Sequence, residues 1–532
     1  MKMIDKIRIK NFKAFPELQE FDLKGKNLLV YGNNGSGKSS LYWALYTLLQ
    51  SSEKDVVRVN DYFAVYDEND KRTFQSLRNI FSTEADSFIE IELQDEAPIR
   101  IEKDNIANTQ TPSVKEANRA SDFVNYKLLH NFYNSTHKQQ LNLWNVFERD
   151  IFPYFSEHNK TFSDRLQNIK TNVPKDKRKR EYSAHLVVIA LFNTKVEELL
   201  VKITMQANKV LKEKFDIQDI KIKLEYNNKL KFKNTGGFNT PCIKMFIDVQ
   251  RNGVFVPNHR PQSFLNEAEL TQIAISIRLG ALFTRLERSD WKILVLDDML
   301  ISLDMSNRMI VSKIVLEDSD LQDFQKIILT HDKGFFDILK SKTDSSEWEY
   351  LEFYKDEKPM DSKPKVKINK TELEKAKEFF RDNEFDACAN YLRKEAEKIL
   401  KHYLNKELID QFESLSNLIG QAKNKIESER LARFNKLFQK STLPLEKLKA
   451  DFDADTTLTP EIKGQLQTVR NHLINFLIQQ NQQEIKVSKI LDELRTIKDR
   501  VLNPGSHRTS MPYYEQELID AIQIIEELNL IL

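Results

Sequence analysis

A glycine-rich loop between an apolar segment and an amphipathic segment constrains the fold of this chain more than any other feature. Residues 32–39 read Gly-Asn-Asn-Gly-Ser-Gly-Lys-Ser and fit the pattern G-x-x-x-x-G-K-[ST] at every fixed position. The apolar run 27–31 precedes the loop, as expected of a buried strand. Apolar residues then recur at helical spacing from Leu41 to Leu49. Strand, loop and helix in this order predict an α/β fold.

The loop has the composition of a phosphate-binding loop (P-loop). Its glycines let the backbone curl so that N–H groups point inward at phosphates, and the following helix adds its dipole. We expect Lys38 to reach the β- and γ-phosphates of ATP and the Ser39 hydroxyl to bind Mg²⁺. A glycine-rich turn without a ligand is the alternative, and the strand and helix around the loop disfavour it. The expected ATP-binding residues are Gly32, Asn33, Asn34, Gly35, Ser36, Gly37, Lys38, Ser39 and Ser40.

Two acidic residues after a second apolar strand supply the carboxylates that a P-loop needs beside it for magnesium binding and hydrolysis. Residues 291–298 read Trp-Lys-Ile-Leu-Val-Leu-Asp-Asp, so a buried strand ends in Asp297 and Asp298. We expect Asp297 to join Ser39 in holding Mg²⁺, and Asp298 to orient or deprotonate the attacking water. Two acids after a strand can also form a simple turn, but the P-loop favours the functional interpretation.

Composition is typical of a helix-rich globular protein and leaves its partners open. The 532 residues suggest two to four domains. Lys and Arg number 81 against 80 Asp and Glu, so any nucleic-acid binding must come from local patches. The only cysteines, Cys242 and Cys388, form no C-x-x-C, which disfavours a zinc site or a disulfide framework. Without an apolar leader or a run of about 18 apolar residues, we expect a cytoplasmic protein with no membrane contact.

Changes of pattern along the chain predict five segments. They are a first lobe with the P-loop, a helical insertion, a second lobe with the acidic pair, a linker and a helical domain, at residues 1–114, 115–215, 216–353, 354–370 and 371–532. The linker is rich in Lys and Pro. The helical domain opens on a capping box formed by Thr371 and Glu374. The expected fold class is therefore an α/β head with a mixed sheet, followed by an all-α domain.

Further motifs resemble those of the ABC-type P-loop ATPases of the RecF, SMC and OLD group. Residues 11–15, Asn-Phe-Lys-Ala-Phe, match that group's opening N-F-[RK]-x-F. Ser302 and Asp304 stand where the group has its D-loop, and Leu-Thr-His-Asp at 329–332 resembles its switch-histidine strand. The resemblance implies that His331 senses the γ-phosphate and holds the attacking water. A lone histidine after a strand is otherwise more often structural.

Two positions depart from that family's pattern. Where members carry L-S-G-G-E, this chain has Asn266 and Glu267, so an asparagine replaces the serine that binds the partner subunit's γ-phosphate. Asparagine can still donate a hydrogen bond. Asp298 stands where glutamate is commoner and is about one methylene shorter, so we predict a slow, switch-like ATPase. The resemblance implies two heads that sandwich two ATP molecules, hence a homodimer or a larger even-numbered homo-oligomer.

The insertion is short and carries one basic cluster. Lys38 and Asp297 are separated by far less chain than in long-armed SMC proteins, so the head is nearer in size to RecF or OLD proteins. Residues 175–180 read Lys-Asp-Lys-Arg-Lys-Arg. Such a run can contact a phosphate backbone, but it is more often a solvated loop between helices.

The helical domain carries a second, weaker resemblance, to HEPN-type domains. Residues 384–400 resemble the first long HEPN helix, and Arg500 and His507 match the R-x₄₋₆-H motif of HEPN ribonucleases at its six-residue limit. There, paired Arg and His side chains from two protomers act without a metal; histidine can serve as acid or base. Val501 departs from the motif, since a polar residue usually follows the arginine. A dimerisation module with an incidental Arg and His is the alternative.

Three functions follow as hypotheses. The first resembles RloC-like and Septu-type anti-phage proteins, in which the ATPase restrains a nuclease that is either its own C-terminal domain, acting on tRNA, or a separately encoded partner. The second is a RecF-like DNA-repair ATPase without nuclease activity, which binds duplex DNA with a steep salt dependence. The third is an ATP-gated scaffold that does neither.

Overall fold

The computed structural model describes most of the chain and divides it into two compact units, residues 1–369 and 370–532. The described residues are 2–125, 127, 131–132, 142–157, 160–174, 180–233, 237–251, 253–258, 261, 265–285, 289–299, 303, 305–355, 361–406, 413–439, 460–503 and 513–532. Each unit is described on its own.

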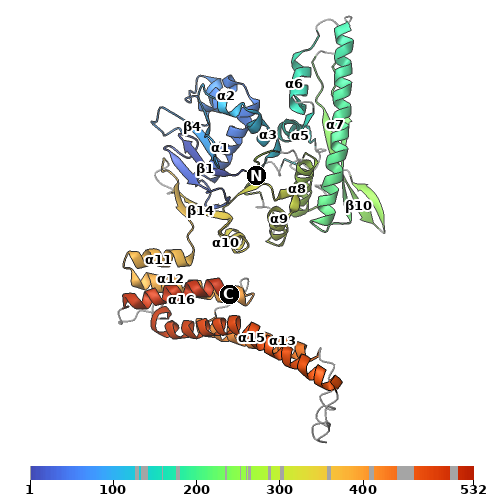
Figure 1. Cartoon of the computed structure of the whole chain (residues 1–532). Helices are drawn as coiled ribbons and strands as arrows, with labels where there is room; N and C mark the ends of the chain where they lie inside the picture. The colour runs from blue at the N-terminus through green and yellow to red at the C-terminus, as the bar shows by residue number, and fades with distance from the viewer. Residues whose placement is uncertain are drawn as a thin grey trace, which may run out of the picture. The chain divides into compact units, whose positions relative to one another are not determined.

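A six-stranded mixed sheet forms the centre of the first unit (Figure 1). In spatial order its strands are β15 (Lys365–Ile368), β14 (Trp348–Tyr354), β3 (Asn27–Gly32), β13 (Gln325–Thr330), β12 (Ile293–Asp297) and β6 (Asp122–Asn125). The strands from β14 to β6 are parallel, and β15 pairs antiparallel with β14. The carboxyl ends of β3, β12 and β13 therefore share one edge of the sheet, where α/β proteins commonly bind ligands.

Both faces of this sheet are buried, as its uninterrupted apolar strands predicted. Leu28 and Val30 of β3 pack into one core, together with helix α1 (Lys38–Gln50) and an antiparallel sheet. That sheet has the order β2 (Gln19–Asp22), β1 (Ile4–Lys10), β4 (Phe88–Leu93) and β5 (Ile99–Glu102). Leu29, between Leu28 and Val30, belongs to a second core on the opposite face. Helix α1 is thus fixed between the two sheets, which positions the P-loop.

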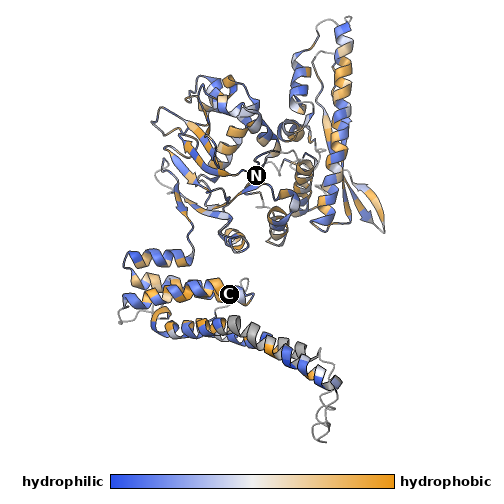
Figure 2. Ribbon diagram, viewed as in Figure 1, coloured by the Kyte–Doolittle hydropathy of each residue, from blue (hydrophilic) through white to orange (hydrophobic). Residues whose placement is uncertain are grey.

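Helices and a three-stranded sheet build the second core. The helices are α5 (Trp144–Asp150), α6 (Phe162–Thr171), α7 (Arg180–Glu213), α8 (Glu267–Thr284), α9 (Met305–Glu317) and α10 (Lys333–Ser341). Helix α3 (Pro112–Ala120) packs into the first core instead. The sheet has the order β11 (Val254–Asn258), β10 (Cys242–Arg251) and β9 (Ile220–Asn228). Two small elements complete the unit, α2 (Val56–Phe63) and the pair β7 (Ser156–Glu157) and β8 (Lys160–Thr161). Figure 2 shows apolar residues along much of α7, which packs on α8.

Four described strands lie where the sequence predicted other structure, namely β6, β7, β8 and β15. Strand β6 falls within the expected helical insertion 115–215. The sequence did not predict it, because its four residues are all buried or partly buried and carry no readable periodicity. Strand β15 falls within the expected linker 354–370. It alternates Lys with Val or Ile, which suits an edge strand with one solvated face. The strand expected at 27–31 and the strand expected before the acidic pair are both present, as β3 and β12.

The second unit is helical in all its described elements. These are α11 (Glu372–Arg381), α12 (Phe385–Tyr403), α13 (Leu415–Gln439), α15 (Pro460–Ile497), a π-helical turn (Lys498–Leu502) and α16 (Glu515–Ile531). The capping box of Thr371 and Glu374 opens α11 as predicted. One core joins the helices, with Leu392 and Leu491 fully buried. Among the described helices of both units, none has the length and apolarity of a membrane span.

Candidate functional site

The glycines of the loop after β3 adopt the conformations that a phosphate cradle requires. Gly35 and Gly37 have φ angles of 81° and 104°, in a region that residues with a side chain rarely adopt. Gly37 also has little room for a side chain, because a Cβ would lie 3.0 Å from Pro364 Cγ and 3.3 Å from Phe15 Cζ. The loop is thus packed against both the N-terminal segment and the segment that leads to β15.

The other loop residues divide into exposed and buried positions. Asn33 and Asn34 are exposed, and the Asn33 side chain accepts a hydrogen bond of 2.9 Å from the Tyr31 hydroxyl. Ser36 is buried, and its hydroxyl has no hydrogen-bond partner among the described residues. Ser40 is buried too, and its hydroxyl accepts a hydrogen bond from the Ala14 N–H at 3.2 Å. The 11–15 segment is therefore tied to the first turn of α1.

Lys38 starts α1 and is held back over its own loop. Its ammonium donates hydrogen bonds to the carbonyl oxygens of Gly32 and Asn33, and it lies 3.8 Å from an Asp298 oxygen. Burial lowers the pKa of Lys38, although the nearby carboxylates of Asp298 and Asp297 oppose this effect. A phosphate at this place would give the ammonium a stronger partner than the two carbonyls.

The predicted magnesium residues are in direct contact. The Ser39 hydroxyl donates a hydrogen bond of 2.8 Å to Asp297 Oδ2. Asp297 ends β12 and is 7% exposed, and its Oδ1 has no hydrogen-bond partner among the described residues. Mg²⁺ prefers oxygen ligands and usually takes one or two from the protein and the rest from phosphate and water. The hydroxyl, the carboxylate and its unsatisfied oxygen therefore fit Mg²⁺.

Asp297 has a perturbed acidity that agrees with this role. Burial raises the pKa of its carboxyl to about 6, while the Ser39 hydrogen bond acts in the opposite direction. A buried carboxyl of this kind gains most from a cation at its free oxygen. No group of three or more His, Cys, Asp or Glu that could hold a metal alone occurs in the part of the chain that the structure describes.

Asp298 and His331 form a second contact at the same sheet edge. Asp298 has a φ of 48°, which aspartate tolerates better than most residues, and its N–H bonds to the Leu329 carbonyl at 3.0 Å. Its Oδ1 accepts the His331 backbone N–H at 2.9 Å and lies 2.8 Å from His331 Nδ1. When the carboxylate is ionised, Nδ1 carries the proton and the ring orientation is fixed. The structure thus brings Lys38, Asp298 and His331 together.

The structure adds a residue that no motif indicated. Arg308 of α9 donates through Nε to the Leu303 carbonyl at 2.9 Å and through Nη1 to Asp332 Oδ2 at 2.6 Å. Asp332 caps α10 by accepting the Phe335 N–H at 3.0 Å. Arg308 therefore links the segment beside the predicted D-loop to the residue after His331. An arginine inside a helix has no sequence signature, whereas an aspartate between a strand and a helix fits the N-cap pattern.

Asn266 and Glu267 lie at the N-terminus of α8, apart from this cluster. Asn266 and Glu269 form a capping box, in which the Asn266 side chain accepts the Glu269 N–H at 2.9 Å and the Glu269 carboxylate accepts the Asn266 N–H at 2.9 Å. Glu267 is exposed. A capped N-terminus of an 18-residue helix presents its positive dipole end to the surface.

The remaining predicted residues stay predictions. Ser302, Asp304 and His507 lie outside the described residues, as do residues 175–179 of the basic cluster. Arg500 lies in the π-helical turn, where its Nε donates a hydrogen bond of 2.9 Å to Glu517.

Parts of the chain are similar to known proteins. One similar solved structure is a Smc head domain with an extended coiled coil bound to the C-terminal domain of ScpA, from Pyrococcus furiosus; the identity is 13%, the TM-score is 0.38, and the match covers 72% of this chain and 100% of that one. A second is an SmcHead bound to the C-winged helix domain of ScpA, with 11% identity, a TM-score of 0.35, and coverage of 70% of this chain and 99% of that one. A third is the SMC head domain from Thermotoga maritima, with 11% identity, a TM-score of 0.31, and coverage of 69% of this chain and 99% of that one. No curated protein matches the chain. Residues 6–244, which contain the P-loop, match the family described as AAA domain, and this match supports a P-loop ATPase in that part of the chain.

Proposed function

We propose that this chain is an ABC-type ATPase that binds and slowly hydrolyses ATP, dimerises on ATP and controls a nuclease effector in bacterial anti-phage defence. The observation that carries the ATPase is the meeting of Lys38, Ser39 and Asp297 at one sheet edge. Asp298 and His331 lie beside them.

Each residue has a separate task in ATP turnover. Lys38 would exchange its two carbonyl partners for the β- and γ-phosphates, and Ser39 and Asp297 would hold Mg²⁺. A cation held there would supply neutralisation of phosphate charge. Asp298 accepts a proton from the attacking water or orients that water, and His331 keeps the carboxylate in place through two contacts. Because an aspartate has a shorter reach than a glutamate, we propose slow turnover.

Dimerisation would complete the site. The Asn266 N-cap and the exposed helix end of α8 offer backbone N–H groups to an anion. We propose that a second copy presents this end to the γ-phosphate, so that ATP joins two heads. Light scattering with the Asp298→Asn variant tests this step: ATP should double the molar mass, and an unchanged mass would count against it. Asn266→Ala should weaken the ATP-induced dimer.

The nuclease effector is proposed from family resemblance alone. It is either the helical domain, with Arg500 and His507 as candidate ribonuclease residues, or a separately encoded nuclease. The discriminating assay incubates purified protein with total tRNA, with and without ATP. Cleavage that is lost in His507→Ala and altered in Lys38→Ala supports the first form. Absence of cleavage by every version directs the search to a partner nuclease.

The defence role has its own test. Cells that express the intact locus should resist at least one phage, and Lys38→Ala should abolish that resistance. Full phage sensitivity would overturn the proposed role without touching the ATPase. ATP-dependent binding to duplex DNA with a steep salt dependence, but without protection, would favour the RecF-like repair function instead.

A further inference from the structure

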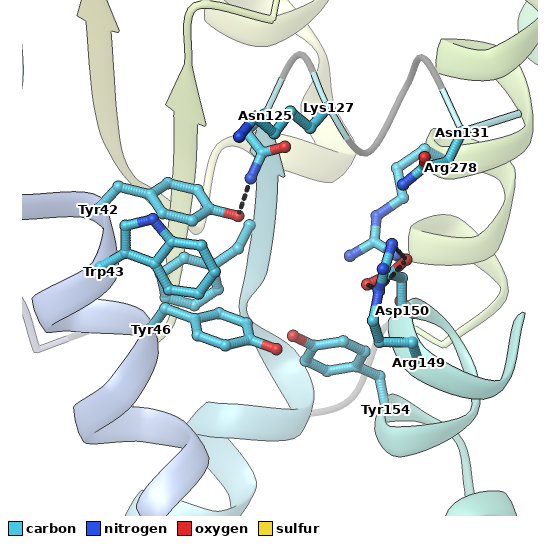
Figure 3. Close-up of a pocket in the computed structure, with 11 residues that line it drawn as sticks. Tyr42, Trp43, Tyr46, Asn125, Lys127, Asn131, Arg149, Asp150, Tyr154 and Arg278 are labelled. Atoms are coloured by element: carbon cyan, nitrogen blue, oxygen red, sulfur yellow. Dashed lines mark hydrogen bonds and ion pairs between the residues drawn. The ribbon is translucent and has the colours of Figure 1, made fainter. Parts of the chain in front are cut away.

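A cavity of about 360 Å³ lies in the first unit between α1, the end of β6 and the helices of the second core (Figure 3). Its size is within the range of small-molecule sites. It is lined by Tyr42, Trp43, Tyr46, Phe123, Asn125, Lys127, Asn131, Arg149, Asp150, Tyr154 and Arg278. None of these residues belongs to the P-loop.

One wall of the cavity is aromatic. Tyr42 and Tyr46 stack with ring planes 6° apart, and Trp43 meets Tyr46 edge-on with ring centroids 5.4 Å apart. Trp43 is 37% exposed, although large aromatic residues on a helix between two sheets are usually covered. Its indole is therefore accessible for stacking. In Figure 3 the hydroxyl groups of Tyr46 and Tyr154 point toward one another across the space. Flat aromatic walls with hydroxyls at their edge suit a planar heterocycle with polar edges.

The opposite side of the cavity is positively charged. Arg278 is buried and held by Asp122, so its charge is largely balanced. Arg149 is 62% exposed and forms a bidentate ion pair with its sequence neighbour Asp150. Its guanidinium faces solvent on its outer side, where a phosphate can approach it while Asp150 stays bound. Lys127, which lies beside Asn125 in Figure 3, is exposed as well.

Lys13 adds to this charge from outside the lining. Its ammonium lies 5.6 Å from the centre of the Trp43 ring. Burial lowers the pKa of Lys13, and the positive charge of Lys127 lowers it further. Two cations that repel one another beside an accessible indole form a place where an anionic group would relieve the repulsion.

We propose that this cavity is a second ligand site, which binds a mononucleotide with its base against Trp43 and Tyr46 and its phosphate at Lys127 and Arg149. A mononucleotide has both parts that the walls require, a planar heterocycle and an anion. The volume suits one nucleotide better than an extended strand.

The cavity is also connected to the ATP site. The Asn125 side chain donates a hydrogen bond of 3.1 Å to the Tyr42 hydroxyl. Tyr42 lies one turn beyond Ser39 on α1, and Asn125 is the register partner of Asp297 across β6 and β12. A nucleotide that moves this pair would shift both magnesium residues. This consequence, unlike the binding itself, rests on the proposed ATPase function.

Binding is tested in the full-length Lys38→Ala protein, which lacks the main phosphate contact of the P-loop. The probes are the 5′-monophosphates of adenosine, guanosine, cytidine, uridine and thymidine, in equilibrium dialysis and by tryptophan fluorescence. Trp144, Trp291 and Trp348 are buried, so a stacked base should quench chiefly Trp43. At least one nucleotide should bind with one-to-one stoichiometry.

Variants decide whether the cavity is the place of binding. In the Lys38→Ala background, Arg149→Glu should lower the affinity at least tenfold, and Trp43→Phe should remove the quenching. Arg72→Glu, at another exposed arginine paired with a near neighbour, is the matched control and should change neither. The proposal is overturned if no nucleotide binds at about 1 mM, or if Arg149→Glu binds as well as its parent. Binding of a single-stranded oligonucleotide alone would also overturn it and assign the cavity to a nucleic-acid strand.

Discussion

The Ser39 hydroxyl and the Asp297 carboxylate meet at 2.8 Å although they stand 258 positions apart in the sequence. Two parallel strands cause this meeting, because β3 leads into the P-loop and β12 ends in Asp297 at the same edge. Asp297 Oδ1 has no other partner among the described residues. The geometry of the cation site that we propose for this pair therefore exists before any ligand binds.

Replacing the Asp297 carboxylate or removing the Ser39 hydroxyl should make ATP binding independent of Mg²⁺. We expect Asp297→Asn and Ser39→Ala each to lower MgATP affinity at least tenfold, with little change in the weaker binding of metal-free ATP. Ser39→Thr keeps a hydroxyl and is the matched control. Calorimetric titrations with and without Mg²⁺ measure the effect. Equal Mg²⁺ dependence in Ser39→Ala and Ser39→Thr would contradict the assignment.

Asp298 should control turnover and leave ATP binding intact. The side chain of an asparagine at this position keeps the shape and tolerates the φ of 48°, but it cannot accept a proton. We expect Asp298→Asn to reduce ATP hydrolysis by about 10²-fold or more. The wild-type rate should itself be slow, and a steady-state rate above about 10 s⁻¹ would refute the switch-like ATPase.

The parts of this site that could be predicted are those that the chemistry restricts to few residue types. Only Gly35 and Gly37 suit the positive φ angles of the loop, and an apolar strand that ends in two acids is readily recognised. Strand β6 could not be predicted, because its four residues are all wholly or partly buried and show no alternation. The cavity that β6 borders was missed for the same reason. Its lining comes from six separate segments, and only the fold brings these together.

The acidity of Asp297 should appear in the pH dependence of stability. Its folded-state pKa of about 6 lies above the ordinary value of 3.8, so protonation favours the folded state. In metal-free protein this contribution is present below about pH 4 and is lost as the pH rises through 6, by on the order of 3 kcal/mol. Asp297→Asn should remove it. Urea unfolding in EDTA from pH 4 to 7 measures the difference, and parallel curves for both proteins would contradict it.

A buried ion network should matter more for stability than any surface ion pair. Asp122 is fully buried on β6 and accepts hydrogen bonds from Arg278, inside α8, and from Arg285, the C-cap residue of α8. Asp122→Ala leaves two arginines without their carboxylate and should destabilise the first unit by about 3–5 kcal/mol. Asp70→Ala, which breaks the exposed pair with Arg72, should cost less than about 1 kcal/mol. Similar losses in the two variants would refute the network's role.

Gly280 should be essential to the packing of α7 on α8, whereas another helical glycine should not. A Cβ at Gly280 would lie 2.6 Å from the Ala207 backbone nitrogen, so Gly280→Ala must push the helices apart. We expect a loss of about 1–3 kcal/mol despite the better helix propensity of alanine. Gly420 in α13 has no neighbour within 4 Å of a Cβ, and Gly420→Ala should stabilise by about 0.5–1 kcal/mol. All four tryptophans lie in the first unit, so fluorescence follows Gly280→Ala and far-ultraviolet circular dichroism follows Gly420→Ala. An increased free energy of unfolding in Gly280→Ala would show that α7 and α8 can move apart without loss of stability.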